Sequence, residues 1–199
     1  MSNYLQPDFY HFSEDSILLS HFAATKCKSL GPIARGADFF AGCGVVGIEF
    51  LQQYSIPIKF DFYEISDDFS EHFFNNQKLL PIEMRELLTW HRADLLSLAE
   101  NIPRYPLIMA NPPFYDQEAH RPAVRGGESR RRCRSWSRVD RLKFISILAC
   151  SLEPTGVAYI LVRADTDFLS LLGQSSDLLL VSLTKLKKSL IAEVCLNIK

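Results

Sequence analysis

The chain has 199 residues, of which 47% are hydrophobic, and its formal net charge at pH 7 is −1. This length and composition suit one compact domain with a sizeable core. The near-neutral charge gives the molecule no overall field for a nucleic acid, so such a partner would have to bind a local basic patch. No apolar run approaches the ~20 residues needed to cross a bilayer, which excludes a helical membrane protein.

The five cysteines are scattered along the chain, and no C-x-x-C pair is present. This pattern predicts neither a zinc site nor a disulfide framework, so we expect no metal cofactor. The first residues are polar and aromatic and lack the basic-then-apolar pattern of a secretory signal. We expect a monomer in the reducing cytoplasm, with no membrane partner.

Residues 1–12 are rich in aromatic side chains and predict an arm that folds onto the rest of the molecule. Ser13 opens an apolar pattern of helical spacing, which predicts a capped helix that ends before Pro32. The sequence thus predicts two units. They are the arm with its helix over residues 1–30 and a main domain over residues 31–199.

Strand-like and helix-like segments alternate through the main domain. The predicted strands are residues 37–41, 59–63, 88–93, 106–110, 157–162, 178–184 and 190–198. The predicted helices are residues 45–54, 67–80, 140–152 and 165–173. Such alternation predicts an α/β fold, in which helices cover both faces of a doubly wound, mostly parallel, seven-stranded sheet. The turn between the last two strands is too short for a crossover, so we expect an antiparallel last strand.

An open sheet of this kind binds its ligand beyond the carboxyl ends of its strands. The first predicted strand runs into a glycine-rich turn in which Gly42 and Gly44 allow tight bends and a close approach to a ligand. Gly47 then lets the following helix pack closely on the sheet. The second strand ends at Glu64, where a carboxylate is placed to accept hydrogen bonds from ribose hydroxyls.

The third predicted strand ends at Asp94-Leu95. This pair offers a carboxylate for an adenine amino group and an apolar side chain for the face of the ring. Taken one at a time, the glycine turn and the two acids have alternative interpretations, as a purely structural turn and as solvated surface carboxylates. Their common place after consecutive strands is what favours a nucleoside-binding site.

The segment after the fourth predicted strand, Asn111-Pro112-Pro113-Phe114, carries the strongest chemical signal. The two prolines fix the backbone and remove two N–H donors, which leaves carbonyl groups to face the cleft. The Asn111 amide oxygen and the Pro112 carbonyl can then accept both hydrogens of one –NH2 group, while Phe114 stacks on a planar ring. Two such acceptors localise the lone pair of a conjugated amine towards an incoming methyl group, so no histidine base is required.

In order and spacing, these four features resemble class I S-adenosylmethionine-dependent methyltransferases of the amino-methylating group, over about residues 5–165. The resemblance implies a Rossmann-like methyltransferase fold with S-adenosylmethionine as the cofactor. It implies that Asn111, Pro112 and Phe114 hold the target nitrogen and its ring. It assigns cofactor binding to Asp38, Ala41, Gly42, Gly44, Glu64, Asp94, Leu95 and Asn111.

The N-terminal arm carries a closer resemblance. Its motif is similar to the lead-in of bacterial tRNA (adenine-N6)-methyltransferases, in which this arm packs on the cofactor site; the matching residues are Gln6, Phe12-Ser13, Asp15-Ser16 and Leu18-Leu19. One departure is Phe40, which stands where the first glycine of the family's turn is usual. The resemblance implies adenine N6 in tRNA as the acceptor. Guanine N2 in rRNA and the side-chain amide of a protein glutamine are alternative acceptors with the same chemistry. A third interpretation is a protein that binds the cofactor or RNA without turnover.

Nine basic residues lie between Arg121 and Lys143, against two acidic ones. They follow the Asn111 segment directly, where a nucleic-acid backbone would have to pass, and Tyr115 and Trp136 interleave aromatic rings with them. A solvated loop is the alternative interpretation. The RNA interpretation predicts phosphate contacts from Arg130, Arg131, Arg132 and Arg134.

Overall fold

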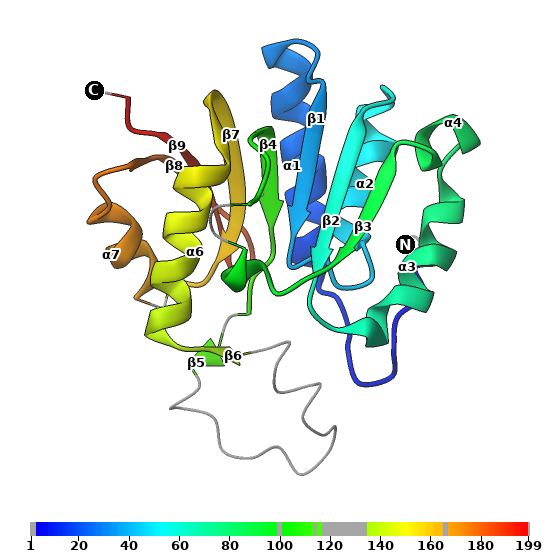
Figure 1. Cartoon of the computed structure of the whole chain (residues 1–199), viewed down its shortest axis with the longest axis horizontal. Coiled ribbons are helices and arrows are strands. Elements are labelled where there is room, and N and C mark those ends of the chain that lie inside the picture. Colours follow the sequence, from blue (N-terminus) through cyan, green and yellow to red (C-terminus); the bar gives the residue numbers. More distant parts are fainter. Residues whose placement is uncertain (1–2, 99–100, 114, 117–134, 165–166, 199) are drawn as a thin grey trace.

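The computed structural model describes residues 3–98, 101–113, 115–116, 135–164 and 167–198. At its centre is a seven-stranded sheet in the order β3-β2-β1-β4-β7-β9-β8 (Figure 1). Its strands are β1 (Arg35–Phe39), β2 (Lys59–Glu64), β3 (Leu88–Arg92), β4 (Tyr105–Ala110), β7 (Leu152–Val162), β8 (Leu178–Lys185) and β9 (Leu190–Leu196). All neighbours pair in parallel except that β9 runs antiparallel to both β7 and β8. The predicted α/β fold with an antiparallel last strand is confirmed.

The α-helices are α1 (Glu14–Leu30), α2 (Val45–Tyr54), α3 (Ser70–Asn76), α4 (Ile82–Arg85), α6 (Arg138–Ser151) and α7 (Phe168–Gly173). The 3-10 turns are η1 (Asp67–Phe69), η2 (Gln77–Leu79) and η3 (Leu95–Ser97). The helix predicted over residues 67–80 is thus observed as three consecutive pieces, η1, α3 and η2. The Ser66 hydroxyl caps the first of them by accepting from the Asp68 N–H at 3.3 Å. Within the described residues, no helix has the length and apolar character needed to span a bilayer.

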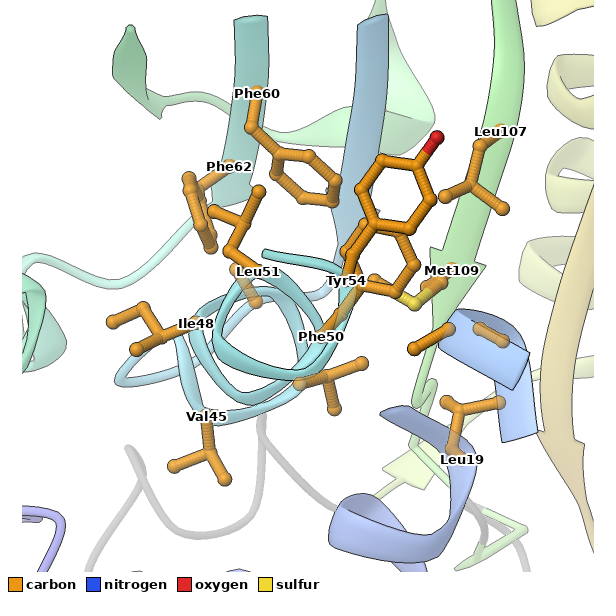
Figure 2. Close-up of a cluster of buried hydrophobic side chains, with 14 of the residues drawn as sticks. Leu19, Val45, Ile48, Phe50, Leu51, Tyr54, Phe60, Phe62, Leu107 and Met109 are labelled. Atoms are coloured by element: carbon orange, nitrogen blue, oxygen red, sulfur yellow. The ribbon is translucent and has the colours of Figure 1, made fainter. Parts of the chain in front are cut away.

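One face of the sheet packs on α1 and α2. Leu107 and Met109 of β4 point to this face, where they meet Phe50 of α2 in one buried cluster (Figure 2). Helix α2 lies close to β2 because Gly47 has no side chain, since a Cβ there would stand 2.4 Å from the ring of Phe62. The predicted packing role of this glycine is confirmed.

The opposite face packs on α6 and α7. The alternate β4 residues Ile108 and Ala110 point there and belong to a second buried cluster with Phe144 and Phe168. Trp136 ends a short strand, β6 (Ser135–Trp136), which pairs with β5 (Tyr115–Asp116). Its ring is only 5% exposed and lies 5.7 Å from the ring of Phe144. Trp136 is thus a core residue and not the exposed stacking aromatic that the sequence suggested.

Helix α1 begins at Glu14, as predicted, but not through the predicted side-chain cap. Within the described chain, the Ser13 hydroxyl makes no capping hydrogen bond. Asp15 instead accepts a hydrogen bond from the Ser189 hydroxyl in the β8–β9 turn at 2.8 Å. The arm before α1 lies on the main domain, where the Tyr4 hydroxyl donates to Glu49 of α2 at 2.7 Å. The start of the chain is therefore attached to the sheet's helical layer through polar contacts.

Candidate functional site

Four loops meet at the carboxyl edge of the sheet, around the point where the strand order reverses between β1 and β4. The first is the glycine turn, residues 40–44. Its Ala41 N–H donates to a β2 carbonyl at 3.0 Å, and its Gly44 N–H donates to the Ala41 carbonyl at 2.8 Å. The φ angle is positive at Phe40 (62°), Gly42 (54°) and Gly44 (80°). Glycine adopts this conformation freely, whereas at Phe40 it is strained.

The two glycines of the turn face different surroundings. A Cβ on Gly42 would be in van der Waals contact with the Phe69 ring at 3.9 Å and the Tyr10 ring at 4.0 Å, so the arm lies directly against this residue. A Cβ on Gly44 would stand 2.6 Å from the ring of Phe73, so this glycine packs on α3. Gly44 therefore has no room for a side chain, whereas at Gly42 it is the positive φ that favours glycine.

Glu64 ends β2 directly beside the glycine turn. One carboxylate oxygen accepts from the Gly42 N–H at 2.9 Å and the other from the Ser66 N–H at 2.8 Å. The side chain is 8% exposed, and burial raises the pKa of the Glu64 carboxyl above its usual range although backbone N–H groups oppose the rise. A carboxylate can accept about four hydrogen bonds, so this one retains acceptor capacity for two hydroxyls.

Asp38 lies fully buried in β1 beneath the glycine turn. One oxygen accepts from the Gly47 N–H at 2.9 Å, which ties the strand to the start of α2. The other oxygen, Oδ1, is buried with no hydrogen-bond partner among the described residues. Burial, with a smaller effect of the nearby Glu64 charge, raises the Asp38 pKa to about 8, although the hydrogen bond from the Gly47 N–H opposes the rise.

A cavity of about 210 Å³ opens between the ends of β2 and β3 and the start of α6. Glu64, Asp94 and Leu95 line it, as the sequence predicted for a nucleoside site. Leu95 is buried, whereas Asp94 is exposed and accepts hydrogen bonds from the Leu96 N–H and the Ser97 hydroxyl that start η3. The lining combines three acidic residues, Glu64, Asp94 and Asp140, with apolar and aromatic side chains.

Asn111 follows β4, with Pro112 buried behind it. Its Nδ2 donates to the Ser16 hydroxyl of α1 at 3.1 Å, which orients the amide. Its Oδ1 is buried and has no hydrogen-bond partner in the described part of the chain. The amide thus presents a free acceptor beside the glycine turn, as an amine clamp requires. Phe114, predicted to stack on the acceptor ring, lies outside the described residues.

The N-terminal arm covers the side of the glycine turn that faces Asn111. A small hollow between them is lined by Tyr10 and Phe12 of the arm, by Ser16 of α1, and by Ala41 and Asn111. The Tyr10 ring packs edge-on against Phe69 with ring centres 5.2 Å apart. The arm and α1 thus supply part of the wall of the site.

Three aromatic residues that were not predicted as site residues, Phe40, Tyr63 and Trp136, line the cavity between Glu64 and Asp94. The Phe40 ring packs edge-on against Trp136 at 5.9 Å and against Phe144 at 5.1 Å, and both Phe40 and Trp136 face the cavity. The sequence indicated Trp136 only as an aromatic residue of the basic stretch, and the pairing of β6 with β5 brings it to the Asn111 segment. The sequence did single out Phe40, because it stands where the first glycine of the family's turn is usual.

The predicted RNA-contacting residues Arg130, Arg131, Arg132 and Arg134 lie outside the described residues. At the described end of the basic stretch, Arg138 and Arg141 both pair with Asp167, at 2.7 Å and 2.6 Å. These two cations therefore join α6 to the segment before α7. In the described ranges, no group of three or more His, Cys, Asp or Glu side chains is arranged to hold a metal ion.

Sequence comparison finds no matching family model and no matching curated protein. Comparison of structures finds clear similarity. The ribosomal protein L11 methylase from Lactobacillus delbrueckii subsp. bulgaricus superposes with a TM-score of 0.65 at 13% identity, over 94% of this chain and 80% of that one. The provisionally named RNA methyltransferase PH1948 from Pyrococcus horikoshii gives 0.64 at 18% identity, over 98% and 90%.

The glycopeptide N-methyltransferase MtfA in complex with S-adenosylmethionine gives a TM-score of 0.63 at 11% identity, over 98% of both chains. At sequence identities this low, the superpositions establish the fold alone. The chain has the Rossmann-like fold of S-adenosylmethionine-dependent methyltransferases, and its four predicted loops lie at the edge of the sheet where this fold binds ligands.

Proposed function

We propose that the chain is an S-adenosylmethionine-dependent N-methyltransferase. The described residues fit this cofactor. The cavity between Glu64 and Asp94 suits its nucleoside half, with the Glu64 carboxylate accepting from the ribose hydroxyls. The hollow between the glycine turn, the arm and Asn111, which Ala41 and Tyr10 line, is the place that we propose for its methionine half.

The observation that carries the reaction type is the free, buried Oδ1 of Asn111. The bound cofactor supplies an electrophilic methyl group. The residues of this chain hold the acceptor, with Asn111 Oδ1 and the Pro112 carbonyl accepting the two N–H groups of a conjugated amine. These two hydrogen bonds orient the amine so that its nitrogen lone pair is less delocalised into the ring and faces the methyl group. The surplus proton leaves to water after transfer.

Adenine N6 in tRNA is the acceptor that we propose. The similarity of the arm to the tRNA (adenine-N6)-methyltransferase lead-in supports it, as does the similar fold of the RNA methyltransferase from Pyrococcus horikoshii. A third support is the β8–β9 turn, which presents the exposed side chains of Lys185, Lys187 and Lys188. β8 runs in the same direction as β4, so this turn lies at the edge that carries Asn111, three strand spacings or roughly 14 Å away. Cations at that distance suit phosphates flanking a target nucleotide.

Asn111→Ala tests the proposal. The substitution should lower the single-turnover rate of methyl transfer to tRNA by roughly 10²–10³, the scale of one missing preorganised hydrogen bond, and leave cofactor affinity nearly unchanged. The matched control is Ser16→Ala, which removes the partner of the amide nitrogen but keeps the acceptor oxygen, and it should cost less than about tenfold. A wild-type rate in Asn111→Ala would remove this residue from the reaction.

Mass spectrometry of the product identifies the acceptor. N6-methyladenosine in tRNA supports the proposal. N2-methylguanosine in rRNA, or a methylated glutamine amide in a protein, would keep the chemistry of Asn111 and replace the substrate. Absence of transfer to all three, together with cofactor binding, would make the chain a binding protein and overturn the proposal.

A further inference from the structure

Asn76, the last residue of α3, is a buried amide that forms hydrogen bonds to three backbone groups outside its own helix. The side chain is 2% exposed. Its Oδ1 accepts from the Leu5 N–H at 2.7 Å, and its Nδ2 donates to the Leu5 carbonyl at 2.8 Å and to the Cys43 carbonyl at 3.0 Å. One side chain therefore joins two segments, the N-terminal arm and the glycine turn.

These hydrogen bonds use both N–H groups of the amide. An asparagine has two N–H donors and one acceptor oxygen, and here each N–H has one partner and the oxygen has one. Aspartate at this position would direct acceptor oxygens at the carbonyls of Leu5 and Cys43. This set of hydrogen bonds therefore requires an amide at position 76, with its nitrogen directed at the carbonyls of Leu5 and Cys43.

The bonded arm residue lies immediately before the stretch that reaches the site. Residues 7–12 follow Leu5 and bring Tyr10 against Phe69 and to within 4.0 Å of the position a Gly42 Cβ would occupy. Their far end is fixed by α1, where Ser16 holds the amide of Asn111. A displacement of Leu5 therefore moves residues 7–12, because their other end is fixed by α1.

We propose that Asn76 is a positioning residue that holds the arm against the glycine turn and thereby sets the affinity for the cofactor. This inference rests on the proposed function, since it takes the hollow that Tyr10, Phe12 and Ala41 line as part of the cofactor's site. Loss of the amide leaves the Cys43 carbonyl and both Leu5 backbone groups without their partner. The arm regains hydration for its groups only by lifting from the turn, so the cofactor loses the wall that Tyr10 and Phe12 provide.

Two measurements on Asn76→Ala and Asn76→Asp test this. Hydrogen exchange of the ligand-free protein should accelerate about tenfold or more for amides of residues 3–12, while the amides of β4 and β7 keep their wild-type rates. The dissociation constant for S-adenosylmethionine should rise about tenfold, and more in Asn76→Asp than in Asn76→Ala. In turnover, the KM for the cofactor should rise while kcat at saturating cofactor stays within about threefold.

Two variants separate positioning from general loss of stability. Val194→Ala truncates a fully buried β9 residue in the second core cluster, so it should lower the melting temperature and leave the arm and the cofactor affinity unchanged. Tyr4→Phe removes the hydrogen bonds of the Tyr4 hydroxyl to Glu49 and Gln52 but keeps the Asn76–Cys43 bond, so it should change cofactor affinity by less than about threefold.

Wild-type exchange in the arm together with wild-type cofactor affinity in both Asn76 variants would overturn the inference. Equal losses of affinity in Val194→Ala and Asn76→Ala would also overturn it, because the effect would then follow stability alone. If the wild-type chain fails to bind S-adenosylmethionine, the proposed function fails. The exchange of residues 3–12 then decides on its own whether Asn76 holds the arm.

Discussion

Glu64 accepts hydrogen bonds from two backbone N–H groups and also lines the nucleoside cavity, so its removal acts on the turn and on the ligand together. Glu64→Ala is expected to weaken S-adenosylmethionine binding by about 1.5–3 kcal/mol, the scale of one hydrogen bond to a charged group. Calorimetric titration measures it. Glu64→Gln, which keeps one acceptor oxygen, should weaken binding less. Unchanged affinity in the alanine variant would remove Glu64 from the ribose role.

The raised pKa of Glu64 adds a dependence on pH. Burial favours the protonated carboxyl in the free protein, whereas ribose hydroxyls need the carboxylate as their acceptor. Cofactor binding therefore lowers this pKa, and affinity should fall as the pH drops through the raised value of the free protein. Titrations across the acid range should show this fall in the wild type and a flat profile in Glu64→Gln. Equal profiles would contradict the assignment.

Asp38 should make the ligand-free protein less stable as the pH rises. Its folded pKa is about 8, above an unfolded value of about 3.9, so ionisation between these values favours the unfolded chain. Asp38→Asn lacks this titration and should gain stability relative to the wild type across that window, by at most about 1.4 kcal/mol per pH unit. Urea unfolding at pH 5 and pH 8 measures the difference. Parallel pH dependences would show that Asp38 stays ionised.

The residues that could be predicted from sequence are those whose role follows from a local pattern. Asn111, Glu64 and Asp94 each follow a strand, so their common edge could be expected before any contact was known. Ser16 and Asn76 could not be assigned in this way, because their partners lie 95 and 71 residues away. Only the assembled sheet brings those partners together.

Among the elements, the basic stretch between β5 and β6 carries the RNA prediction. β5 and β6 pair side by side, so the described residues before and after this stretch lie next to each other, close to the Asn111 segment. Replacing Arg130, Arg131, Arg132 and Arg134 by glutamine should lower RNA affinity. On single-stranded RNA, the log–log slope against salt should fall by about 0.7 for each phosphate that an arginine no longer neutralises.

Cofactor affinity should not change in that variant, since the four arginines follow the Asn111 segment. The control replaces Lys28 and Lys59, two exposed lysines, of which Lys59 begins β2 at the opposite edge of the sheet. It should leave the salt slope as in the wild type. Coincident lines for the arginine variant and the wild type would mean that these charges do not contact RNA.

Element boundaries followed the sequence where apolar periodicity was strong. β1, β2 and β4 are nearly continuous buried runs and were predicted near their observed places. The strand predicted over residues 157–162 is the buried second part of β7, which begins at Leu152. The helix expected over residues 67–80 was not observed as one element, because 3-10 turns stand at both ends of a short α-helix. β5 and β6 have two residues each. A strand this short has no alternation of apolar and polar residues by which the sequence could predict it.

At the scale of the whole molecule, the directions of the strands followed from general rules of chain connection. Strand–helix alternation requires parallel neighbours and right-handed crossovers, and the short last turn requires one antiparallel strand. The position of the arm follows from no such rule. It depends on single polar contacts, such as that of Tyr4 with Glu49, whose choice of partner no periodicity reveals.

The long sequence separation of the arm from its partners has a kinetic consequence. During synthesis the arm emerges first, but Asn76 and Asn111 are made 71 and 95 residues after Leu5 and Ser16. The loops that these contacts close are entropically costly and gain their enthalpy only on a formed sheet. We therefore expect the binding wall to assemble last. In refolding experiments, strand signals should recover in an earlier phase than the capacity to bind cofactor.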